Sequence, residues 1–314
     1  MTSKFEFLTG NPPPSFGFSG EEYLYNLPEY IGTWPDLNTY SFYILHKIKK
    51  QIVGYIRFQE IEEKAYSPYM APFGSFAISE DVKFDILNEF NVFIISYFKT
   101  IGIKKIIIKH YPRFYQSDCN DLIIASMGLI GFHITTIDLN QYIEVSDSPF
   151  STFIHPMELR YLKKCKRAGM IFNEHQNIEV ESLFNYIESF RKARKIPVNI
   201  NLSTLKKLFS KFPDNYRCFS VSMNEEIIAA TISVEVNDRV LYNFLPAHND
   251  QYNNYSPMIY LMNGIYEYAI LNKYKYIDLG ISSKEGTAQP GLIKFKERLG
   301  AKSASKLTFM KEIR

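Results

Sequence analysis

The stretch Gly291-Leu-Ile-Lys-Phe-Lys-Glu-Arg-Leu-Gly-Ala301 decides how we interpret the rest of the chain. On a helix with about 100° per residue, Leu292, Phe295 and Leu299 form one apolar face. Lys296 lies about 40° from Leu292, inside that face. A lysine in this position extends its ammonium to water, pairs with an acid, or faces a site for an anionic or polar ligand. The helical wheel alone leaves these alternatives open.

The same order of predicted elements occurs twice along the chain. Residues 40–58 and 216–235 each predict a β-hairpin, because β-branched and aromatic residues flank a short polar turn. Each hairpin precedes a helix, a strand, a second helix and a last strand. The predicted helices are 84–100, 117–127, 256–272 and 291–299, and the predicted strands are 102–108, 132–145, 240–245, 275–279 and 306–311. This order indicates an internal duplication with a mixed α/β sheet in each half.

Several short segments of the second copy resemble the C-terminal half of FemABX-like proteins. They are Val240-Leu-Tyr-Asn-Phe-Leu-Pro246, Tyr255-Ser-Pro257, Tyr276-Ile-Asp-Leu-Gly280, Gly291-Leu-Ile-Lys-Phe-Lys296 and Leu299-Gly-Ala301. The resemblance covers residues 216–313 well and the N-terminal half loosely. FemABX-like proteins are tandem GNAT-fold acyltransferases, so the resemblance implies two tandem GNAT-like domains with the acyl-CoA N-acyltransferase fold. In that family the lysine of the Phe-Lys pair contributes to the active site, which implies a catalytic role for Lys296.

We expect the N-terminal GNAT-like domain to span residues 1–148 and the C-terminal, FemAB-like domain to span 149–314, each with its own sheet. The second domain begins with a basic helical entry segment, in which helices are predicted at 158–168, 180–195 and 202–212. Lys163 and Arg167 in the first of these helices are candidates for binding phosphates of a nucleotide-linked donor or of tRNA. The alternative is a solvated helix face whose cations lie near the C-terminal end of the dipole.

The length and the amino-acid composition of the chain are those of a globular protein. A chain of 314 residues with 46% hydrophobic and 22% charged residues accommodates one large domain or two ordinary ones. The net charge of +3 does not indicate DNA binding. Three widely separated cysteines predict a reducing compartment, and neither they nor the six histidines have metal-site spacing. Without a signal-peptide pattern or an apolar run of ~18 residues, we expect a cytoplasmic protein with no membrane span and no metal site.

Candidate site residues cluster around the third strand of the second copy. In a GNAT-type sheet two parallel strands separate and the acyl donor enters between them. Tyr242 on the strand 240–245 and Tyr255 before the next helix are candidate hydroxyl donors, Tyr242 as a catalytic residue and Tyr255 as a binding residue. Ser256 is a predicted N-cap, and the helix start that follows contains no acid, so its N–H groups are candidates for anion binding.

Further candidates follow the next strand. Asp278 ends a predicted parallel strand, where open α/β sheets bind ligands, although an ordinary cap or salt bridge is the alternative. Ser282 and Ser283 lie on a glycine-containing loop that could close over a substrate. The sequence contains neither a Gly-x-Ser-x-Gly elbow nor a Walker-type loop.

The acyl donor is either an aminoacyl-tRNA or an acyl-CoA. Acetyl-CoA-dependent relatives carry the pattern Gln/Arg-x-x-Gly-x-Gly/Ala, whereas this chain reads Gln251-Tyr-Asn-Asn-Tyr-Ser256 without glycine. Backbone N–H groups approach a pyrophosphate less closely when side chains intervene. We therefore expect poor CoA binding.

The leading hypothesis is an N-acyltransferase that transfers an acyl or aminoacyl group to an amine of a cell-envelope precursor. The acceptor class comes from the resemblance. One alternative is an acyl-CoA-dependent N-acetyltransferase acting on a nucleotide sugar or a small amine. Another is a catalytically silent GNAT-like module that binds a ligand or a partner.

Overall fold

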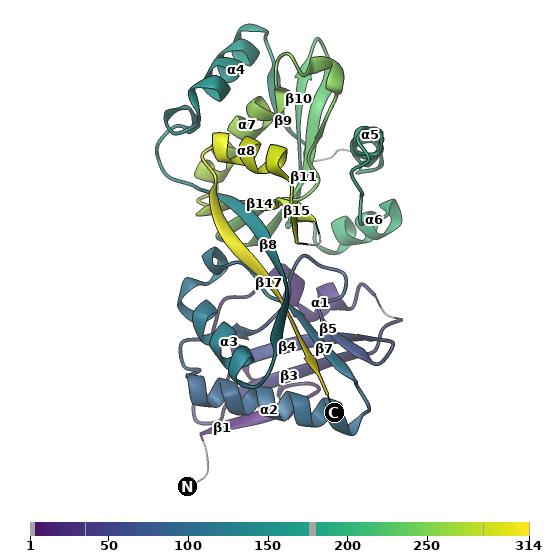
Figure 1. The fold of residues 1–314 in the computed structure, drawn as a ribbon, viewed down its shortest axis with the longest axis vertical. Coiled ribbons are helices and arrows are strands. Elements are labelled where there is room, and N and C mark those ends of the chain that lie inside the picture. Colours follow the sequence, from purple (N-terminus) through teal and green to yellow (C-terminus); the bar gives the residue numbers. More distant parts are fainter. Residues whose placement is uncertain (1–3, 35, 176–179, 285, 314) are drawn as a thin grey trace. The chain divides into compact units, whose positions relative to one another are not determined.

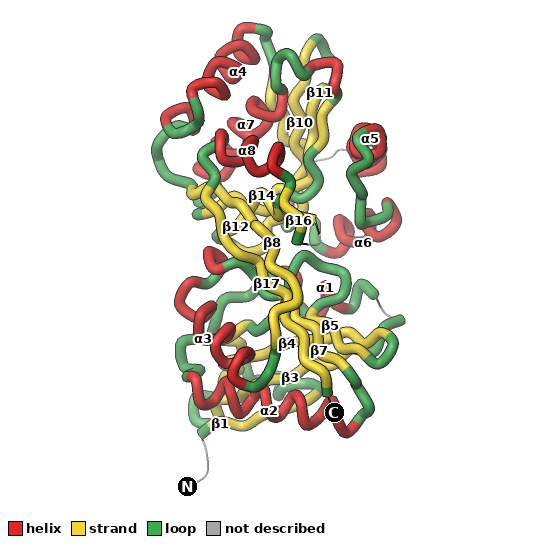
Figure 2. The backbone as a smooth tube through the Cα atoms, in the orientation of Figure 1, coloured by secondary structure: helices red, strands yellow, loops and turns green. Residues whose placement is uncertain are grey.

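A computed structural model describes residues 4–34, 36–175, 180–284 and 286–313 (Figure 1). Helices and strands are interspersed along the chain (Figure 2). The chain packs into two compact units. Unit 1 consists of Met1–Leu139, Glu285–Thr287 and Ala304–Arg314, and unit 2 of Asn140–Lys284 and Ala288–Ser303. The domain border that we expect near residue 148 stays a prediction.

In unit 1 the sheet has the strand order β1-β3-β4-β5-β7-β17. These strands are β1 (Phe5–Thr9), β3 (Thr39–His46), β4 (Gln51–Ile61), β5 (Lys64–Ser67), β7 (Lys105–Lys109) and β17 (Lys302–Glu312). The short strands β2 (Gly17–Phe18) and β6 (Ala77–Ile78) also pair with β4. Strands β5 and β7 run parallel, whereas β3–β4, β4–β5 and β7–β17 are antiparallel.

Helices cover this sheet because their apolar residues recur at intervals of three and four. The helical elements of unit 1 are η1 (Leu24–Asn26), α1 (Pro28–Ile31), α2 (Phe84–Thr100), η2 (Arg113–Tyr115) and α3 (Ser117–Leu129). In α2 the residues Leu87, Phe90, Ile94 and Phe98 are buried on one face. Phe98 meets the rings of Phe42 and Phe58 edge-on, so this face forms the core beneath the β3–β4 hairpin.

In unit 2 the sheet has the order β8-β14-β12-β11-β10-β9. Its strands are β8 (His133–Glu144), β9 (Ile171–His175), β10 (Tyr216–Met223), β11 (Glu226–Asn237), β12 (Val240–Asn243) and β14 (Tyr276–Ile281). Strand β13 (Ala247–His248) pairs with β11, and β15 (Ser283–Lys284) pairs with β16 (Thr287–Ala288). The helical elements are η3 (Phe150–Thr152), α4 (Pro156–Arg167), α5 (Val180–Ala193), α6 (Leu202–Lys211), η4 (Asp250–Tyr252), α7 (Pro257–Leu271) and α8 (Pro290–Arg298).

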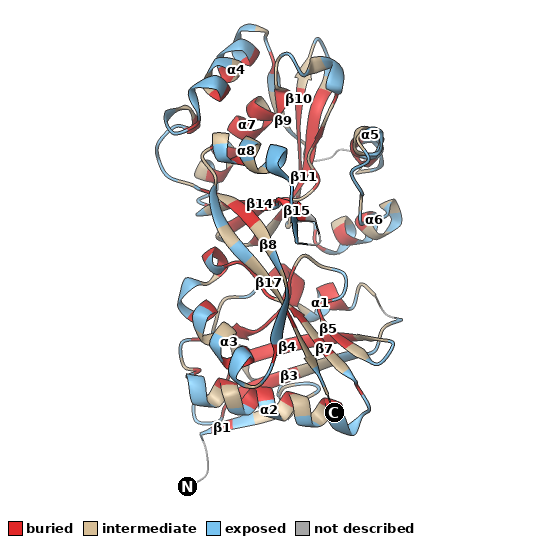
Figure 3. Cartoon of the chain, in the orientation of Figure 1, coloured by how far each residue is buried: buried red, intermediate tan, exposed pale blue. Residues whose placement is uncertain are grey.

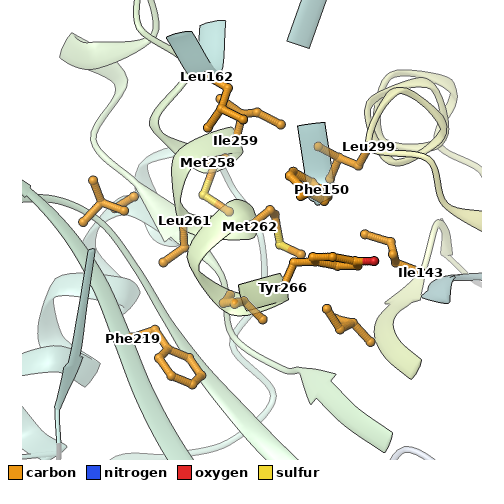
Figure 4. Packing of buried hydrophobic residues seen from close by; sticks show 14 of the residues in the cluster. Ile143, Phe150, Leu162, Phe219, Met258, Ile259, Leu261, Met262, Tyr266 and Leu299 are labelled. Carbon is orange, nitrogen blue, oxygen red and sulfur yellow. The ribbon is translucent and has the colours of Figure 1, made fainter. Parts of the chain in front are cut away.

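Helix α7 is the centre of the core of unit 2 (Figure 3). It is apolar on nearly all sides, as expected for a helix with protein around it. Met258, Ile259, Leu261, Met262 and Tyr266 lie in one buried cluster with residues of the sheet and of the neighbouring helices (Figure 4). Leu241 of β12 belongs to the same cluster, so packing against α7 helps to fix the strand that carries the candidate site.

The last strands of the two sequence copies are exchanged. The end of the first copy, residues 140–144 of β8, pairs with β14 in unit 2. The end of the second copy, β17, pairs with β7 in unit 1. Strand β8 is also a neighbour of β17, and Thr135 Oγ1 donates to Thr308 O within unit 1. The expectation that each half forms a separate sheet is therefore wrong, because β8 belongs to both.

Most predicted elements are confirmed, and α2 agrees in both of its ends. The strands that were not predicted include β1, near the N-terminus, and β9, between the two copies. The short pair η1 and α1 lies before the first predicted hairpin. In the parts of the chain that the structure describes, no helix combines the length and apolar character needed to cross a membrane.

We expect Gly264→Ala to lower the free energy of unfolding by about 1–3 kcal/mol. A Cβ at position 264 of α7 would lie 2.2 Å from Cδ2 of Phe172 on β9, so the ring would have to move. Gly128→Ala is the matched control, because position 128 of α3 has open space around an added Cβ and should gain about 0.5–1 kcal/mol. Urea unfolding of the three proteins measures both effects, and equal stabilities of the two variants would contradict this packing.

Candidate functional site

The site begins where two parallel strands of unit 2 stop pairing. Val240, Leu241 and Tyr242 of β12 pair with residues 276–278 of β14. Beyond the pair Tyr242–Asp278, β12 ends at residue 243, whereas β14 continues to residue 281. The carboxyl ends of parallel strands are the usual ligand sites of open α/β sheets. The expected strand, helix and point of separation are thus all present in this unit.

Lys296 is buried at this point, with a relative exposure of 5%. Its ammonium Nζ donates to Gly280 O at 2.8 Å and to Ile281 O at 3.2 Å. Burial lowers the pKa of Lys296 to about 8, and the negative charge of Asp278 acts in the opposite direction. Since the ammonium binds two carbonyls inside unit 2, the alternative in which it extends to water is wrong.

The apolar face predicted for α8 is only partly buried. Leu299 is buried, but Leu292 is exposed, which is a correction of the helical-wheel interpretation. Among the described residues of α8, Lys296 is the buried one. A helix that turns its lysine inward while its leucine meets solvent is not organised by hydrophobic burial alone.

Asp278 fixes the turn that presents the two carbonyls. Its Oδ1 accepts from the backbone N of Gly280 at 2.7 Å and from Nδ2 of Asn140 on β8 at 2.7 Å. Gly280 has φ +71°, and a Cβ there would lie 3.2 Å from Cε2 of Tyr242. Glycine is therefore required both for the conformation and for the close approach of the tyrosine ring. The turn brings Tyr242, Asp278 and Lys296 together, three of the residues expected to act.

Tyr242 is half-buried beside this turn. Burial and the charge of Asp278 raise the pKa of Tyr242 above its ordinary value, and Arg191 acts in the opposite direction. Its hydroxyl therefore stays protonated at neutral pH and can donate a hydrogen bond. The Arg191 guanidinium on α5 donates to Pro246 O at 3.2 Å and to Pro197 O at 3.0 Å.

Sequence reasoning missed Asn140, Gln141 and Arg191. The first two lie on a strand assigned to the other copy, and Arg191 lies in the second helix of the basic entry segment. Gln141 is fully buried, and its Oε1 accepts from Ser282 Oγ at 2.7 Å. A buried Asn-Gln pair within a strand is the signal that could have pointed to them.

Ser282 and Ser283 are both buried. Ser282 follows β14, and its backbone O accepts from Gln289 N at 2.9 Å. These contacts hold the start of the segment between β14 and α8 in place. A role of the two serines in substrate binding stays a prediction.

Ser256 precedes α7 but does not cap it with its side chain. The predicted N-cap position is confirmed, but the residue has φ +57° and its hydroxyl makes no cap hydrogen bond. Tyr255 lies beneath the Lys164 ammonium, which is 4.5 Å from the ring centroid. Lys164 Nζ also donates to Asn254 O at 2.7 Å, so α4 is fastened to the loop before α7.

The loop before α7 uses its own polar groups. The backbone N–H groups of several of its residues donate to acceptors inside the loop: Gln251, Tyr252, Asn253, Tyr255 and Ser256. Arg194 forms an ion pair with Asp250 and also bonds to His248. An N–H that already donates within the loop cannot hold a pyrophosphate unless the loop rearranges. This geometry agrees with the missing glycine pattern.

Lys163 and Arg167 are exposed on α4. The helix begins after His155, whose Nδ1 accepts from Met157 N, and the buried Leu162 and Cys165 attach it to α7. The structure thus places the two cations on a solvent-facing surface of α4. Their role in phosphate binding stays a prediction.

In unit 1 the corresponding strand separation is filled by the chain itself. The parallel pair β5–β7 ends at Ser67 and Ile108. Directly beyond it, Gly74 N donates to Lys109 O at 3.0 Å and Ser75 N donates to Ser67 Oγ at 3.1 Å. Residues 67–75 therefore occupy the space that an acyl donor would need in this unit.

A buried polar network secures this filled gap. Ser75 Oγ lies 2.8 Å from His110 Nδ1, and Asn120 Nδ2 donates to His110 Nε2 at 3.0 Å. Burial lowers the pKa of His110 to about 3, so the ring is neutral. With Nε2 accepting, the proton lies on Nδ1 and is donated to Ser75. The histidine does not act as a base toward this serine, and the network is structural.

Comparison with known proteins agrees with this geometry. Residues 179–290 match the acetyltransferase (GNAT) domain family. This range contains β12, α7 and β14, whereas Lys296 of α8 and Asn140 of β8 lie outside it. No curated protein sequence matches the chain.

Solved structures share the whole fold at low sequence identity. FemX has a TM-score of 0.72 with 10% identity, covering 93% of this chain and 93% of its own. L-PGS from Bacillus licheniformis has a TM-score of 0.59 with 12% identity, covering 95% and 89%. A tandem GNAT protein from the clavulanic acid biosynthesis pathway has a TM-score of 0.55 with 10% identity, covering 99% of each chain.

The chain therefore contains a GNAT-domain match over residues 179–290 and shares the fold of the FemX structure. Its fold class is that of tandem GNAT-like domains. The predicted fold class, the FemABX-like resemblance and the enzyme class are thereby confirmed.

The buried lysine gives stability a defined pH dependence. Its pKa falls from 10.5 in an exposed lysine to about 8 in the folded protein, so between these values the unfolded chain binds more protons. The free energy of unfolding therefore rises with pH across this window. We expect the stability difference between wild type and Lys296→Met to shift in favour of wild type by about 2 kcal/mol between about pH 7 and pH 9.5.

Urea unfolding at the two pH values measures this shift. Lys294→Met is the control, because Lys294 is exposed on the same helix and its removal should leave the pH dependence unchanged. If the free energy of unfolding of wild type minus that of Lys296→Met stays constant or decreases with rising pH, the ammonium is not desolvated.

Proposed function

We propose that the protein transfers an aminoacyl or acyl group to an amine of a cell-envelope precursor, and that unit 2 carries the reaction. The observation that carries the proposal is the buried Lys296 ammonium, held by two carbonyls beside Tyr242 and Asp278 where β12 and β14 separate. A buried cation is costly unless it is paired or needed by a ligand. The GNAT match over residues 179–290 supports acyl transfer as the reaction class.

In this reaction the acceptor nitrogen attacks the acyl carbonyl carbon. A C–N bond forms, the C–O bond to the donor breaks, and the proton lost by the amine ends on the leaving oxygen. The carbonyl oxygen carries negative charge in between. An ammonium has three N–H groups, and two of those of Lys296 bind Gly280 O and Ile281 O. The third is the donor that we assign to the developing oxyanion.

A pKa of about 8 suits Lys296 to a second task. Near neutral pH the group is mostly protonated, yet it loses a proton more readily than an exposed lysine. In the neutral form two N–H groups still satisfy the two carbonyls, and the lone pair points in the third direction. Lys296 can therefore hold or accept a proton at the position where it meets the substrate.

The donor that we favour is an aminoacyl-tRNA. The loop before α7 has no glycine, and its backbone N–H groups are already used within the loop. Five exposed cations on α4 offer contacts for a phosphate backbone: Arg160, Lys163, Lys164, Lys166 and Arg167. Lys163 and Arg167 are the pair that we assign to donor phosphates.

The acceptor class follows from the resemblance to FemABX-like proteins. The amine would belong to a precursor made in the cytoplasm, and the three free, buried cysteines support a reducing compartment. An acyl-CoA-dependent enzyme and a silent binding module are the competing functions. The CoA-dependent function requires the loop before α7 to rearrange. The silent binding module gives no reason for the buried ammonium.

We expect acetyl-CoA to bind with a dissociation constant well above the low-micromolar range. The physical reason is that the loop offers few free N–H groups to a pyrophosphate. Isothermal titration calorimetry with acetyl-CoA measures this affinity directly. A low-micromolar dissociation constant would favour the CoA-dependent function instead.

Lys296→Met should lower the transfer rate by ~10²-fold or more, because the oxyanion loses its charged donor. The assay combines a panel of aminoacyl-tRNAs with amine-bearing cell-envelope precursors and follows transfer of a labelled aminoacyl group. Circular dichroism should show that the variant remains folded. Full activity of a folded Lys296→Met protein would exclude the catalytic role.

The control for this assay is Lys294→Met, which removes a cation from the exposed face of α8. Arg298→Met is unsuitable, although Arg298 lies on the same helix. Its Nη1 is 3.9 Å from the buried Glu158 carboxylate, and its backbone O accepts from His155 N. Burial raises the pKa of Glu158, and removal of Arg298 would leave that acid without its cation.

A further inference from the structure

The core of unit 2 contains a polar group of side chains beneath α7, which we call the Thr231 group: Thr231, Ser233 and Asn243. All three are buried, with relative exposures of 0%, 0% and 6%. Ser233 and Asn243 are directly paired across β11 and β12, so their side chains lie on the same face of the sheet. Thr231 is two residues before Ser233 and shares that face.

This face of the sheet is otherwise the apolar core around α7. Leu241, two residues before Asn243 on β12, belongs to the buried cluster that contains Met258 and Met262 (Figure 4). Buried hydroxyl and amide groups in such surroundings are costly unless they are hydrogen-bonded. The Thr231 group therefore needs an explanation.

Its hydrogen bonds are incomplete. Thr231 Oγ1 donates to Asn243 Oδ1 at 2.6 Å, which orients the amide. The Nδ2 of Asn243 then faces Met262 Sδ at 3.6 Å, and a thioether is a weak acceptor. Ser233 Oγ has no hydrogen-bond partner among the described residues. One N–H donor and one hydroxyl are thus left for a group that the protein does not supply.

The Thr231 group, with its unpaired polar atoms, lies next to the candidate site in the sequence of β12. Asn243 is the residue after Tyr242, and pairing between β12 and β14 ends at Tyr242. Neighbouring residues of a strand point to opposite faces, so Tyr242 and Asn243 flank the separation of the two strands from its two sides. An acyl group that lies between the strands meets the hydroxyl of Tyr242 on one side and the Thr231 group on the other.

Two methionine side chains beside the Thr231 group can move to accommodate an acyl group. Met258 and Met262 are four residues apart on α7, on the side that faces the sheet. Methionine side chains are unbranched and adapt to different occupants at little cost. Movement of Met262 would free Nδ2 of Asn243 for a better acceptor.

We propose that the Thr231 group forms the end of the pocket for the transferred group and selects acyl or aminoacyl groups that carry a small hydrogen-bonding substituent, such as a hydroxyl. This inference rests on the acyl transfer proposed above and names the chemical class of the group transferred. Asn243 Nδ2 donates to the substituent, and Ser233 Oγ donates to it or accepts from it. An aliphatic group of the same size leaves both unsatisfied and binds more weakly.

The experiment compares one tRNA charged either with serine or with alanine, which differ by a hydroxyl. Binding and protection of the ester against spontaneous hydrolysis are measured, and neither needs the acceptor. We expect wild type to prefer the seryl form by about tenfold. Asn243→Leu should reduce the preference to about one, and Ser233→Ala should reduce it in the same direction. A wild-type preference near one, or one that both variants retain, overturns the proposal.

Asn263→Leu is the matched control. Asn263 is buried in the same core, but its Nδ2 donates to Glu267 Oε1 on its own helix at 2.8 Å. Its replacement should leave the seryl preference intact. If Asn263→Leu removes the preference as fully as Asn243→Leu does, the effect comes from general loosening of the core and the proposal is wrong.

Thermal unfolding separates failure of this inference from failure of the proposed function. Removing a buried hydroxyl that lacks a partner should raise Tm in Ser233→Ala, whereas loss of a structural bond or of an ordered water would lower it. If neither charged tRNA binds wild type, the proposed tRNA donor is wrong. The Tm values then still show whether the Thr231 group has a purely structural role. A lower Tm in both Ser233→Ala and Asn243→Leu assigns the group a purely structural role and overturns the inference.

Discussion

The interaction on which the site depends is the bond between the Lys296 ammonium and the carbonyls of Gly280 and Ile281. Removing a cation from water is expensive, and two neutral carbonyls compensate for only part of that cost. The consequence is a pKa that moves to about 8. The surrounding structure is arranged to keep these carbonyls in place. Asp278 holds the turn, Asn140 holds Asp278, and α7 holds the strand beside them.

Much of this could be predicted from local sequence patterns. The spacing of apolar residues gave α2 its ends, and the position of Lys296 on the helical wheel pointed to a special environment. Other features depend on contacts between residues far apart in the chain. Strand β9 has the polar sequence Ile171-Phe-Asn-Glu-His175, which lacks a clear alternation, and it is a strand because β10 pairs with it. Asn140 and Arg191 reach the site through the fold. The polar pair Asn140-Gln141 inside a predicted strand is a weak local signal, and nothing local marks Arg191.

The two units differ at the point where their parallel strands stop pairing. In unit 2 the parallel strands β12 and β14 separate beside a buried cation and a tyrosine. In unit 1 the strands β5 and β7 separate in the same way, but residues 67–75 fill the space and His110 secures them. In one half of the duplicated fold the core thus extends past the end of the parallel strands, and in the other half a buried cation and a tyrosine lie there. Fold and activity are separable properties, because chemistry depends on what occupies one small region of the sheet.

The exchange of last strands has a consequence for how the chain is made. Strand β17, which pairs with β7 in unit 1, is encoded after the whole of unit 2. While the ribosome is still synthesising unit 2, the edge of β7 that β17 will cover has open N–H and C=O groups. Such an edge invites pairing with other nascent chains. Early folding of unit 1 is thereby incomplete until translation reaches the final strand, and chains that stop short would expose this edge to chaperones and proteases.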